Sequence, residues 1–273
     1  MTLAARVVWV ALLRASSATA ADPCDELAGQ LQTRLEMTKM VMEPEGALGA
    51  IYTRATEASS RCADNEALAY LRLRAAELGR GAIVGHEPDS ARNEWRTLAR
   101  ELTAKFPNSV RIATISARAS GAVADAKRAV DLQASYAPAV VALAAALVAT
   151  DPQQAATSLA GAKNLAVVSD GYTVLARVRL ALRDLDGATK AANLALHGRD
   201  MNLIEPDARD PRPLAGAHET LAMVFLEKRD FKKAAKHLEL ASADSEKARA
   251  ILENPPPGLK KVLPKSERRD RAR

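Results

Sequence analysis

Residues 217–241 read AHETLAMVFLEKRDFKKAAKHLELA, and their pattern is the strongest indication of the fold in the chain. Apolar residues recur in it at helical spacing before and after Asp230, which predicts two helices joined by a tight turn. Small side chains in the pattern let the paired helices approach each other, and large apolar ones fill the gap to neighbouring units. The residues that carry the pattern are Leu221, Ala222, Phe225, Asp230, Phe231, Ala234, Leu238 and Ala241.

The same pattern occurs twice more on the N-terminal side of this stretch. One copy comprises Leu175, Ala176, Asp184, Leu185, Ala188, Ala192, Ala195 and Leu196, and the other Leu143, Ala144, Leu147, Asp151, Pro152, Ala155, Leu159 and Ala162. The copies that begin at Leu143 and Leu175 are 32 residues apart, whereas Leu221 follows Leu175 by 46 residues. The longer spacing indicates an insertion, and its prolines and aspartates predict a loop over residues 198–216.

These spacings are typical of the tetratricopeptide repeat (TPR), and the chain resembles exported bacterial proteins of that family. The resemblance is best over residues 137–168, 169–202 and 215–248, although Arg179 stands where a large aromatic or aliphatic side chain is usual. It implies an all-α fold, a right-handed superhelical solenoid of antiparallel helix pairs over residues 21–253. Upstream of the best repeats, helices are predicted over residues 25–41, 44–59, 66–78, 90–106, 109–119 and 122–132, which gives about six pairs in all.

The composition agrees with helices that pack through small side chains. Hydrophobic residues make up 48% of the 273 residues, but aromatic residues only 3%. β-Sandwiches and barrels favour aromatic and β-branched residues, so the composition argues against them. Charged residues make up 26% of the chain, which is ordinary and excludes a protein disordered from end to end.

The net charge of +6 is concentrated at the two ends of the chain. Residues 1–20 carry two arginines and no acid, and residues 254–273 carry a net charge of +5, so residues 21–253 are close to neutral, at −1. A neutral body lacks the basic face that binding to a nucleic-acid backbone needs. We therefore expect no nucleic-acid binding by the folded body.

The N-terminus has the features of an export signal. Arg6 precedes the apolar run Val7–Leu13, and the small residues Ala18–Ala20 precede a predicted cut after Ala20. A mistaken upstream start or a frayed helix end is the alternative interpretation of residues 1–20. Because no stretch reaches the roughly 20 apolar residues that a membrane span needs, we expect no transmembrane span and a periplasmic or secreted protein of the bacterial cell envelope.

The two cysteines are placed where a disulfide can form. In a hairpin of two helices of similar length, Cys24 at the start of the first and Cys62 after the end of the second lie at the same end. An oxidising compartment favours such a bond. The alternative is two unlinked buried thiols, and two cysteines without a nearby histidine do not make a zinc site.

The concave side of a TPR-like solenoid is lined by the first helix of each pair, and such a surface binds proteins. The helical phase places nine mostly apolar residues on this side, which suits an extended or helical peptide. The alternative is that several of them pack against adjoining helices. The chain lacks the paired lysine and asparagine positions with which some TPR proteins hold a C-terminal carboxylate. The nine residues are Val141, Ala145, Val148, Thr173, Arg177, Leu180, Glu219, Met223 and Leu226.

The chain contains no recognisable catalytic or nucleotide-binding motif, so we expect neither an enzyme nor a cofactor. Of the four histidines, His218 and His237 lie on the two helices of the last predicted pair and can meet across it. Without an acidic or thiol partner, such a pair indicates a packing contact rather than a metal site.

The C-terminal residues 254–273 begin with three prolines and are predicted to form a disordered tail. The tail is basic, and its cations suit an anionic lipid, a cell-wall polymer or an acidic partner; the alternative is a solubilising end without a partner. These cations include Lys260, Lys261, Lys265, Arg268 and Arg269.

Taken together, these features predict a non-catalytic adaptor or assembly scaffold that holds a protein or peptide partner. Two alternatives stay open. The repeats can pack permanently into a larger envelope complex as a structural subunit, or the basic tail can act as an electrostatic tether with the repeats as a spacer.

Overall fold

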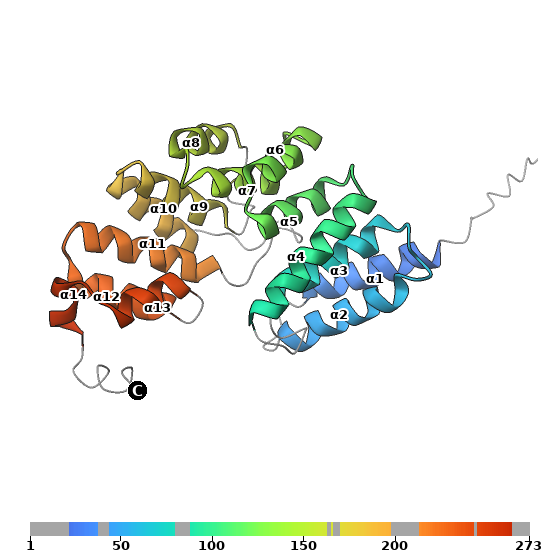
Figure 1. The fold of residues 1–273 in the computed structure, drawn as a ribbon, viewed down its shortest axis with the longest axis horizontal. Coiled ribbons are helices and arrows are strands. Elements are labelled where there is room, and N and C mark those ends of the chain that lie inside the picture. Colours follow the sequence, from blue (N-terminus) through green and yellow to red (C-terminus); the bar gives the residue numbers. More distant parts are fainter. Residues whose placement is uncertain are drawn as a thin grey trace, which may run out of the picture.

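The computed structural model of the chain describes residues 22–37, 44–79, 88–162, 165, 170–197, 213–242 and 245–263. Within these ranges the regular secondary structure consists of fourteen α-helices, and there is no strand (Figure 1). In chain order the helices are α1 (Pro23–Met37), α2 (Pro44–Ala58), α3 (Glu66–Leu78), α4 (Pro88–Lys105), α5 (Val110–Ser120), α6 (Val123–Leu132), α7 (Ala137–Leu147), α8 (Pro152–Gly161), α9 (Gly171–Ala181), α10 (Leu185–His197), α11 (Pro213–Glu227), α12 (Phe231–Ala241), α13 (Glu246–Glu253) and α14 (Pro257–Val262). The prediction of an all-α fold is confirmed.

The predicted helices correspond to the observed ones over most of the described chain. Helix α3 spans the predicted residues 66–78, and α4, α5 and α6 end within two residues of their predicted bounds. Residues 198–212 of the predicted loop lie outside the described residues. Helix α11 begins at Pro213, inside that predicted loop, because proline is favourable at the first position of a helix.

Side-chain caps explain where several of the helices begin. A side-chain oxygen of the residue before the helix accepts a hydrogen bond from a backbone N–H in the first turn, which would otherwise lack a partner in the helix. Such caps start α3, α5, α8, α12 and α13, and their residues are Asn65, Ser109, Asp151, Asp230 and Ser245.

The turns of the last two predicted repeats have the same geometry, 46 residues apart. Arg183 and Arg229 both adopt the left-handed conformation, with φ of 62° and 58°. The aspartate after each turn accepts a hydrogen bond from a backbone N–H in the next helix, from Gly187 to Asp184 and from Lys233 to Asp230. The structure thus repeats where the sequence pattern repeats.

The helices are stacked in sequential antiparallel pairs and form two layers. Each helix from α1 to α12 contacts the next one, and the odd-numbered helices from α1 to α11 also contact one another in order. They form a continuous inner layer. Figure 1 shows the chain as an arch, with α6 and α8 at its outer edge and α5, α7 and α9 beneath them. Helices α1 to α12 provide the six predicted pairs.

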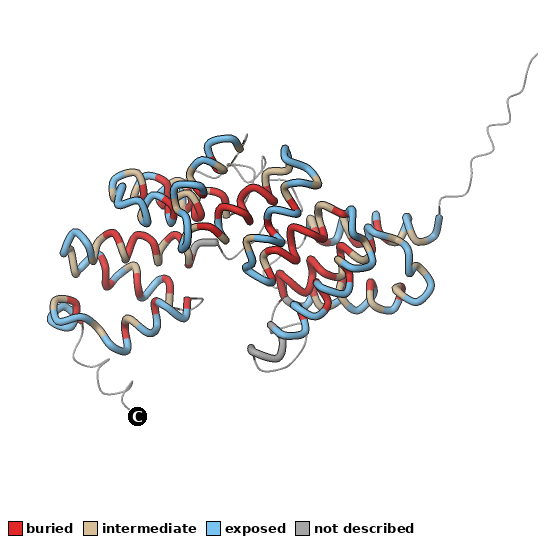
Figure 2. Tube along the Cα trace, turned by 45° about the horizontal axis from the view of Figure 1, so that its top comes forward, coloured by how far each residue is buried: buried red, intermediate tan, exposed pale blue. Residues whose placement is uncertain are grey.

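The core runs along the arch between the two layers (Figure 2). Alanine supplies many of its contacts, and Ala126, Ala144, Ala176, Ala192 and Ala222 are all fully buried. Larger residues, mostly leucine and isoleucine, fill the N-terminal part of the core between α1 and α5. Small residues in the C-terminal repeats allow their paired helices to approach closely.

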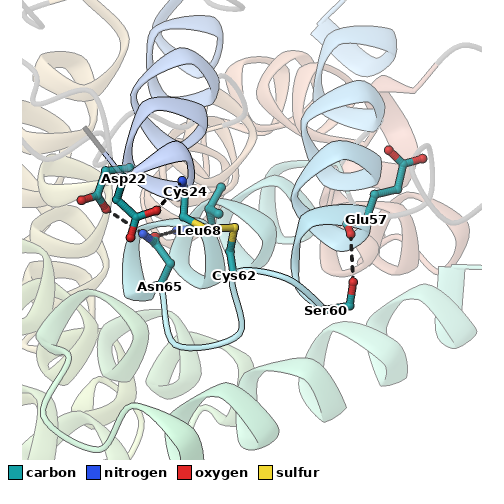
Figure 3. The surroundings of a disulfide bond; sticks show 8 residues. Asp22, Cys24, Glu57, Ser60, Cys62, Asn65 and Leu68 are labelled. Carbon is teal, nitrogen blue, oxygen red and sulfur yellow. Dashed lines mark hydrogen bonds between the residues drawn. A yellow bond between two sulfur atoms is a disulfide. The ribbon is translucent and has the colours of Figure 1, made fainter. Parts of the chain in front are cut away.

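A disulfide joins Cys24 and Cys62, as predicted, with 5.7 Å between their Cα atoms (Figure 3). Because Cys24 lies at the start of α1 and Cys62 follows α2, the bond closes the open end of this pair. The same end is tied to α3, since the Asn65 side-chain amide donates to the Asp25 carboxylate over 2.7 Å. The Asn65 side-chain oxygen also accepts the Leu68 N–H at the start of α3.

The C-terminal residues differ from the predicted disordered tail. After α13, residues 254–256 lead into the short helix α14, which packs on α12. Leu259 is fully buried in the last core cluster, and Gly258 lies against the Phe231 ring with no room for a side chain. The prolines therefore redirect the chain instead of ending its structure, because buried apolar contacts hold α14 in place. Residues 264–273, with Lys265, Arg268 and Arg269 of the predicted basic tail, lie outside the described residues.

The predicted signal peptide, residues 1–20, lies outside the described residues. None of the described helices has the length and apolar character that crossing a membrane requires.

Replacing Ala176 or Ala222 with leucine is expected to lower the free energy of unfolding by about 1 to 3 kcal/mol, because the added atoms overpack a closed helix pair. Both alanines are fully buried. Urea unfolding of each variant measures the effect. The exposed Ala181 of α9 provides the control, since Ala181→Leu places the same side chain at the surface. Two variants as stable as this control would contradict the packing described here.

Candidate binding surface

The nine residues predicted to line the concave side differ widely in exposure. Val141 is fully buried and Thr173 is 5% exposed, so these two belong to the core and offer no surface to a partner. Helix α7 contacts α5, α6, α8 and α9, and α9 contacts α7, α8, α10 and α11. The helical phase of one helix does not reveal how many of its faces are covered in this way. The exposed residues are Ala145 and Arg177, and the half-buried ones are Val148, Leu180, Glu219, Met223 and Leu226.

Glu219 brings three helices together through charged contacts. Its carboxylate lies 3.7 Å from the guanidinium of Arg177 on α9 and 3.5 Å from the ammonium of Lys247 on α13. It also accepts a 2.8 Å hydrogen bond from the hydroxyl of Ser245, which caps α13. The two cations are about half exposed, and the carboxylate is only 13% exposed. This polar network therefore presents a net positive charge to solvent beside Met223 and Leu226.

Two members of this network, Ser245 and Lys247, were not among the predicted surface residues. Both fall within the predicted repeat 215–248, but after Ala241, the last residue that carries its pattern; Ser245 caps α13 and Lys247 lies in the first turn of that helix. The signal available in the sequence is the serine followed by an acidic residue, which is typical of a helix start.

A second charged network is buried between α3 and α5. Glu77 of α3 pairs with Arg74 of the same helix and with Arg118 of α5, whose guanidinium lies 3.5 Å from it. Glu77 and Arg74 are 3% and 1% exposed. Burial alone would lower the pKa of Arg118, but attraction to the carboxylates of Glu77 and Asp170 outweighs it and raises the pKa above its usual value. The network therefore holds charged groups inside the inner layer.

Other arginines of the inner layer lie over aromatic rings. The guanidinium of Arg111 on α5 is 3.5 Å from the ring centre of Tyr70 on α3, and that of Arg72 is 5.7 Å from the ring centre of Tyr52 on α2. Such contacts are favourable because the ring face carries negative charge. Arg111 also borders an open groove of about 510 Å³, together with Asp25, Ala28, Gly29, Gln32, Ala67 and Leu71. The groove lies between α1, α3 and α5.

His218 and His237 meet across the last repeat, as their positions in the sequence allow. Their Nδ1 atoms are 3.0 Å apart, and the Phe225 ring stacks on His237 with 5.5 Å between centres. Burial is the main cause of a lowered pKa in both histidines, and the pKa of His237 falls to about 4. The pair is therefore neutral at pH 7, with one ring donating to the other. No group of three or more metal-binding side chains occurs among the residues that the structure describes.

The histidine pair is expected to make folding less favourable in mild acid. In the unfolded chain histidine titrates near pH 6.5, so between this pH and about 4 the unfolded state binds protons that the folded state does not. Stability is unaffected above pH 7 and falls as the pH drops through this window. Because the rings are only half buried, the loss is about 1 to 2 kcal/mol rather than the full value of the shift.

Urea unfolding at pH 7 and pH 4.5 measures this loss, and a His218→Gln/His237→Gln double variant serves as the comparison. Carboxylates contribute equally to both proteins, so the difference between them reports on the pair. The control is His197→Gln, which removes an exposed histidine and should leave the acid sensitivity of the wild type unchanged. Equal acid sensitivity of the double variant and the wild type would contradict the prediction.

No protein-family model matches the chain, and no curated protein matches it. Among solved structures, the chain is similar to a chain in the crystal structure of the APC/C hetero-tetramer Cut9–Hcn1, with 13% sequence identity and a TM-score of 0.38. The match covers 88% of this chain and 53% of that chain, so the protein spans about half the length of the chain it matches. The helix pairs, their contacts and the repeated turns define an all-α helical-repeat protein with TPR-like architecture.

Proposed function

We propose that the protein is a non-catalytic adaptor that holds a protein partner on the inner side of its C-terminal repeats. The observation that carries this proposal is the row of accessible side chains on α9, α11 and α13. Arg177 and Lys247 supply positive charge there, and Leu180, Met223 and Leu226 supply partly exposed apolar surface. This combination suits an extended or helical peptide that carries apolar residues and at least one acidic residue.

An oxidising compartment is part of the same proposal. The disulfide between Cys24 and Cys62 supports it, because such bonds persist in periplasmic and secreted proteins and are rare in reducing compartments. We therefore place the adaptor in the cell envelope or outside the cell.

Crosslinking of the tagged protein in its native compartment, followed by mass spectrometry of captured chains, tests the proposal. An Arg177→Ala/Met223→Ala variant is expected to lose most of the captured partner while keeping its helical content by circular dichroism. The matched control is Arg34→Ala/Met37→Ala, which removes the same residue types from the exposed face of α1. Equal capture by both variants would rule out this surface.

Truncation separates the adaptor from the alternatives. The truncated chain should end at Leu263, because α14 belongs to the folded core. Capture that survives this truncation supports binding by the repeats, whereas capture that disappears supports an electrostatic tether. A partner that cannot be removed without unfolding the protein supports a permanent structural subunit.

A further inference from the structure

A second hollow lies on other helices than the proposed partner surface. It has a volume of about 490 Å³ and lies between α4, α5 and α6. All but one of its lining side chains are polar, and their types are two arginines, three hydroxyls, an amide and a carboxylate. The lining residues are Asn93, Arg96, Thr97, Arg100, Ser116, Ala119, Ser120 and Asp125.

The two arginines of this hollow are four residues apart on α4, so they lie on the same face of the helix. The Nε of Arg96 donates to the backbone oxygen of Ala119 over 3.0 Å, which fixes the guanidinium and leaves its two terminal nitrogens for other partners. The terminal nitrogen of Arg100 donates to the Thr97 hydroxyl over 3.3 Å. Neither arginine has a carboxylate within 4 Å among the described residues, although Asp125 lines the same hollow.

The first turn of α6 reaches the hollow through Asp125. The N-cap residue of α6 is Ala122, which has no side chain able to accept from the first turn. The backbone N–H groups of that turn therefore keep their positive partial charge, which favours an anion near the start of the helix. The carboxylate of Asp125 in this turn neutralises part of this positive charge. Because the two arginines carry two positive charges against its one negative charge, the hollow keeps a net positive charge.

We propose that this hollow binds a phosphate monoester that carries hydroxyl groups. Each planar guanidinium can donate two parallel hydrogen bonds to a pair of phosphate oxygens. The Thr97 and Ser116 hydroxyls and the Asn93 amide can add donors, whereas the Ser120 hydroxyl already donates to the backbone oxygen of Ala117. Asp125 accepts hydrogen bonds but donates none, so it suits a hydroxyl group of the ligand rather than its phosphate. The volume is that of a site for a small molecule or a lipid headgroup.

Isothermal titration calorimetry with glycerol 3-phosphate tests the site, with glycerol as the uncharged control. Saturable binding of glycerol 3-phosphate is expected, and Arg96→Gln and Arg100→Gln are each expected to weaken it about tenfold or more. The matched control is Arg34→Gln, which removes an exposed arginine of α1 far from the hollow. Equal weakening in all three variants, or no saturable binding, would overturn the proposal.

Two further measurements separate a loss of binding from a loss of folding. Asp125→Asn removes the negative charge from the hollow and is expected to bind inorganic phosphate more tightly than the wild type; unchanged or weaker binding would contradict the assignment. Arg100→Gln removes only the bond to Thr97, so circular dichroism should show the wild-type fold even if Arg96→Gln is destabilised.

Vesicles containing phosphatidylinositol 4-phosphate, whose headgroup carries both a phosphate monoester and free hydroxyl groups, distinguish the two sources of this chemistry. Vesicle binding that is lost in Arg100→Gln assigns the site to a lipid headgroup, and binding of the free ester alone assigns it to a small molecule. Both results support a phosphate site. Vesicle binding that is unchanged in Arg100→Gln, without binding of the free ester, would overturn it.

Discussion

Replacement of Glu77 with alanine is expected to lower the free energy of unfolding by about 3 to 5 kcal/mol, because it removes the carboxylate from a buried charge network. Glu77 contacts the guanidiniums of Arg74 and Arg118, and Arg74 is only 1% exposed. Both cations would stay in the interior after the substitution. Asp170 still attracts Arg118 after the substitution, which limits the cost at that residue.

Chemical unfolding of three variants measures this effect. Glu77→Gln keeps the shape of the side chain and one hydrogen-bond acceptor, so its loss of stability should lie between those of the wild type and Glu77→Ala. The exposed Glu101 of α4 provides the matched control, and Glu101→Ala should cost less than about 0.5 kcal/mol. A Glu77→Ala variant as stable as this control would show that the network contributes nothing to folding.

Removal of the disulfide is expected to have the second largest effect. Cys24 and Cys62 are separated by 38 residues, and release of a loop of this size raises the entropy of the unfolded chain enough to cost about 3 to 4 kcal/mol. The hydrogen bond between Asn65 and Asp25 remains, so the N-terminal helices should keep their arrangement in the reduced folded state.

The Cys24→Ser/Cys62→Ser variant should therefore melt at a lower temperature than the oxidised wild type. Reduced wild-type protein should melt close to the double variant, and dithiothreitol should leave the double variant unchanged. If oxidised and reduced wild type have the same stability, the bond does not constrain the unfolded chain as described.

Most of the fold could be predicted from the sequence, because the interactions that determine it are local. The tight turns at Arg183 and Arg229 are followed by aspartates that cap the next helix, and small residues mark the faces of each pair. The disulfide could be predicted for a similar reason, since two helices of similar length bring Cys24 and Cys62 to one end.

The features that could not be predicted depend on contacts between elements. Arg74 and Glu77 look like solvent-exposed charges within the pattern of α3, but this helix packs against α1, α2, α4 and α5 and loses its exposed face. Val141 and Thr173 are buried for the same reason. Helix α14 is too short to show a periodic pattern, and its place depends on the burial of Leu259 and Leu263 in the last core cluster.

The inner layer of odd-numbered helices also determines how the molecule can bend. Among the described helices, substantial contacts join only those that are neighbours or next neighbours in order. Each helix pair can therefore rotate slightly against the next one, and the curvature of the arch is the sum of these small rotations. The contacts of Glu219 with Arg177 and Lys247 bridge two successive interfaces, from α9 to α11 and from α11 to α13. A partner that competes with Glu219 for either cation would weaken these two interfaces and change the curvature of the C-terminal half. The disulfide-linked N-terminal pair would keep its shape.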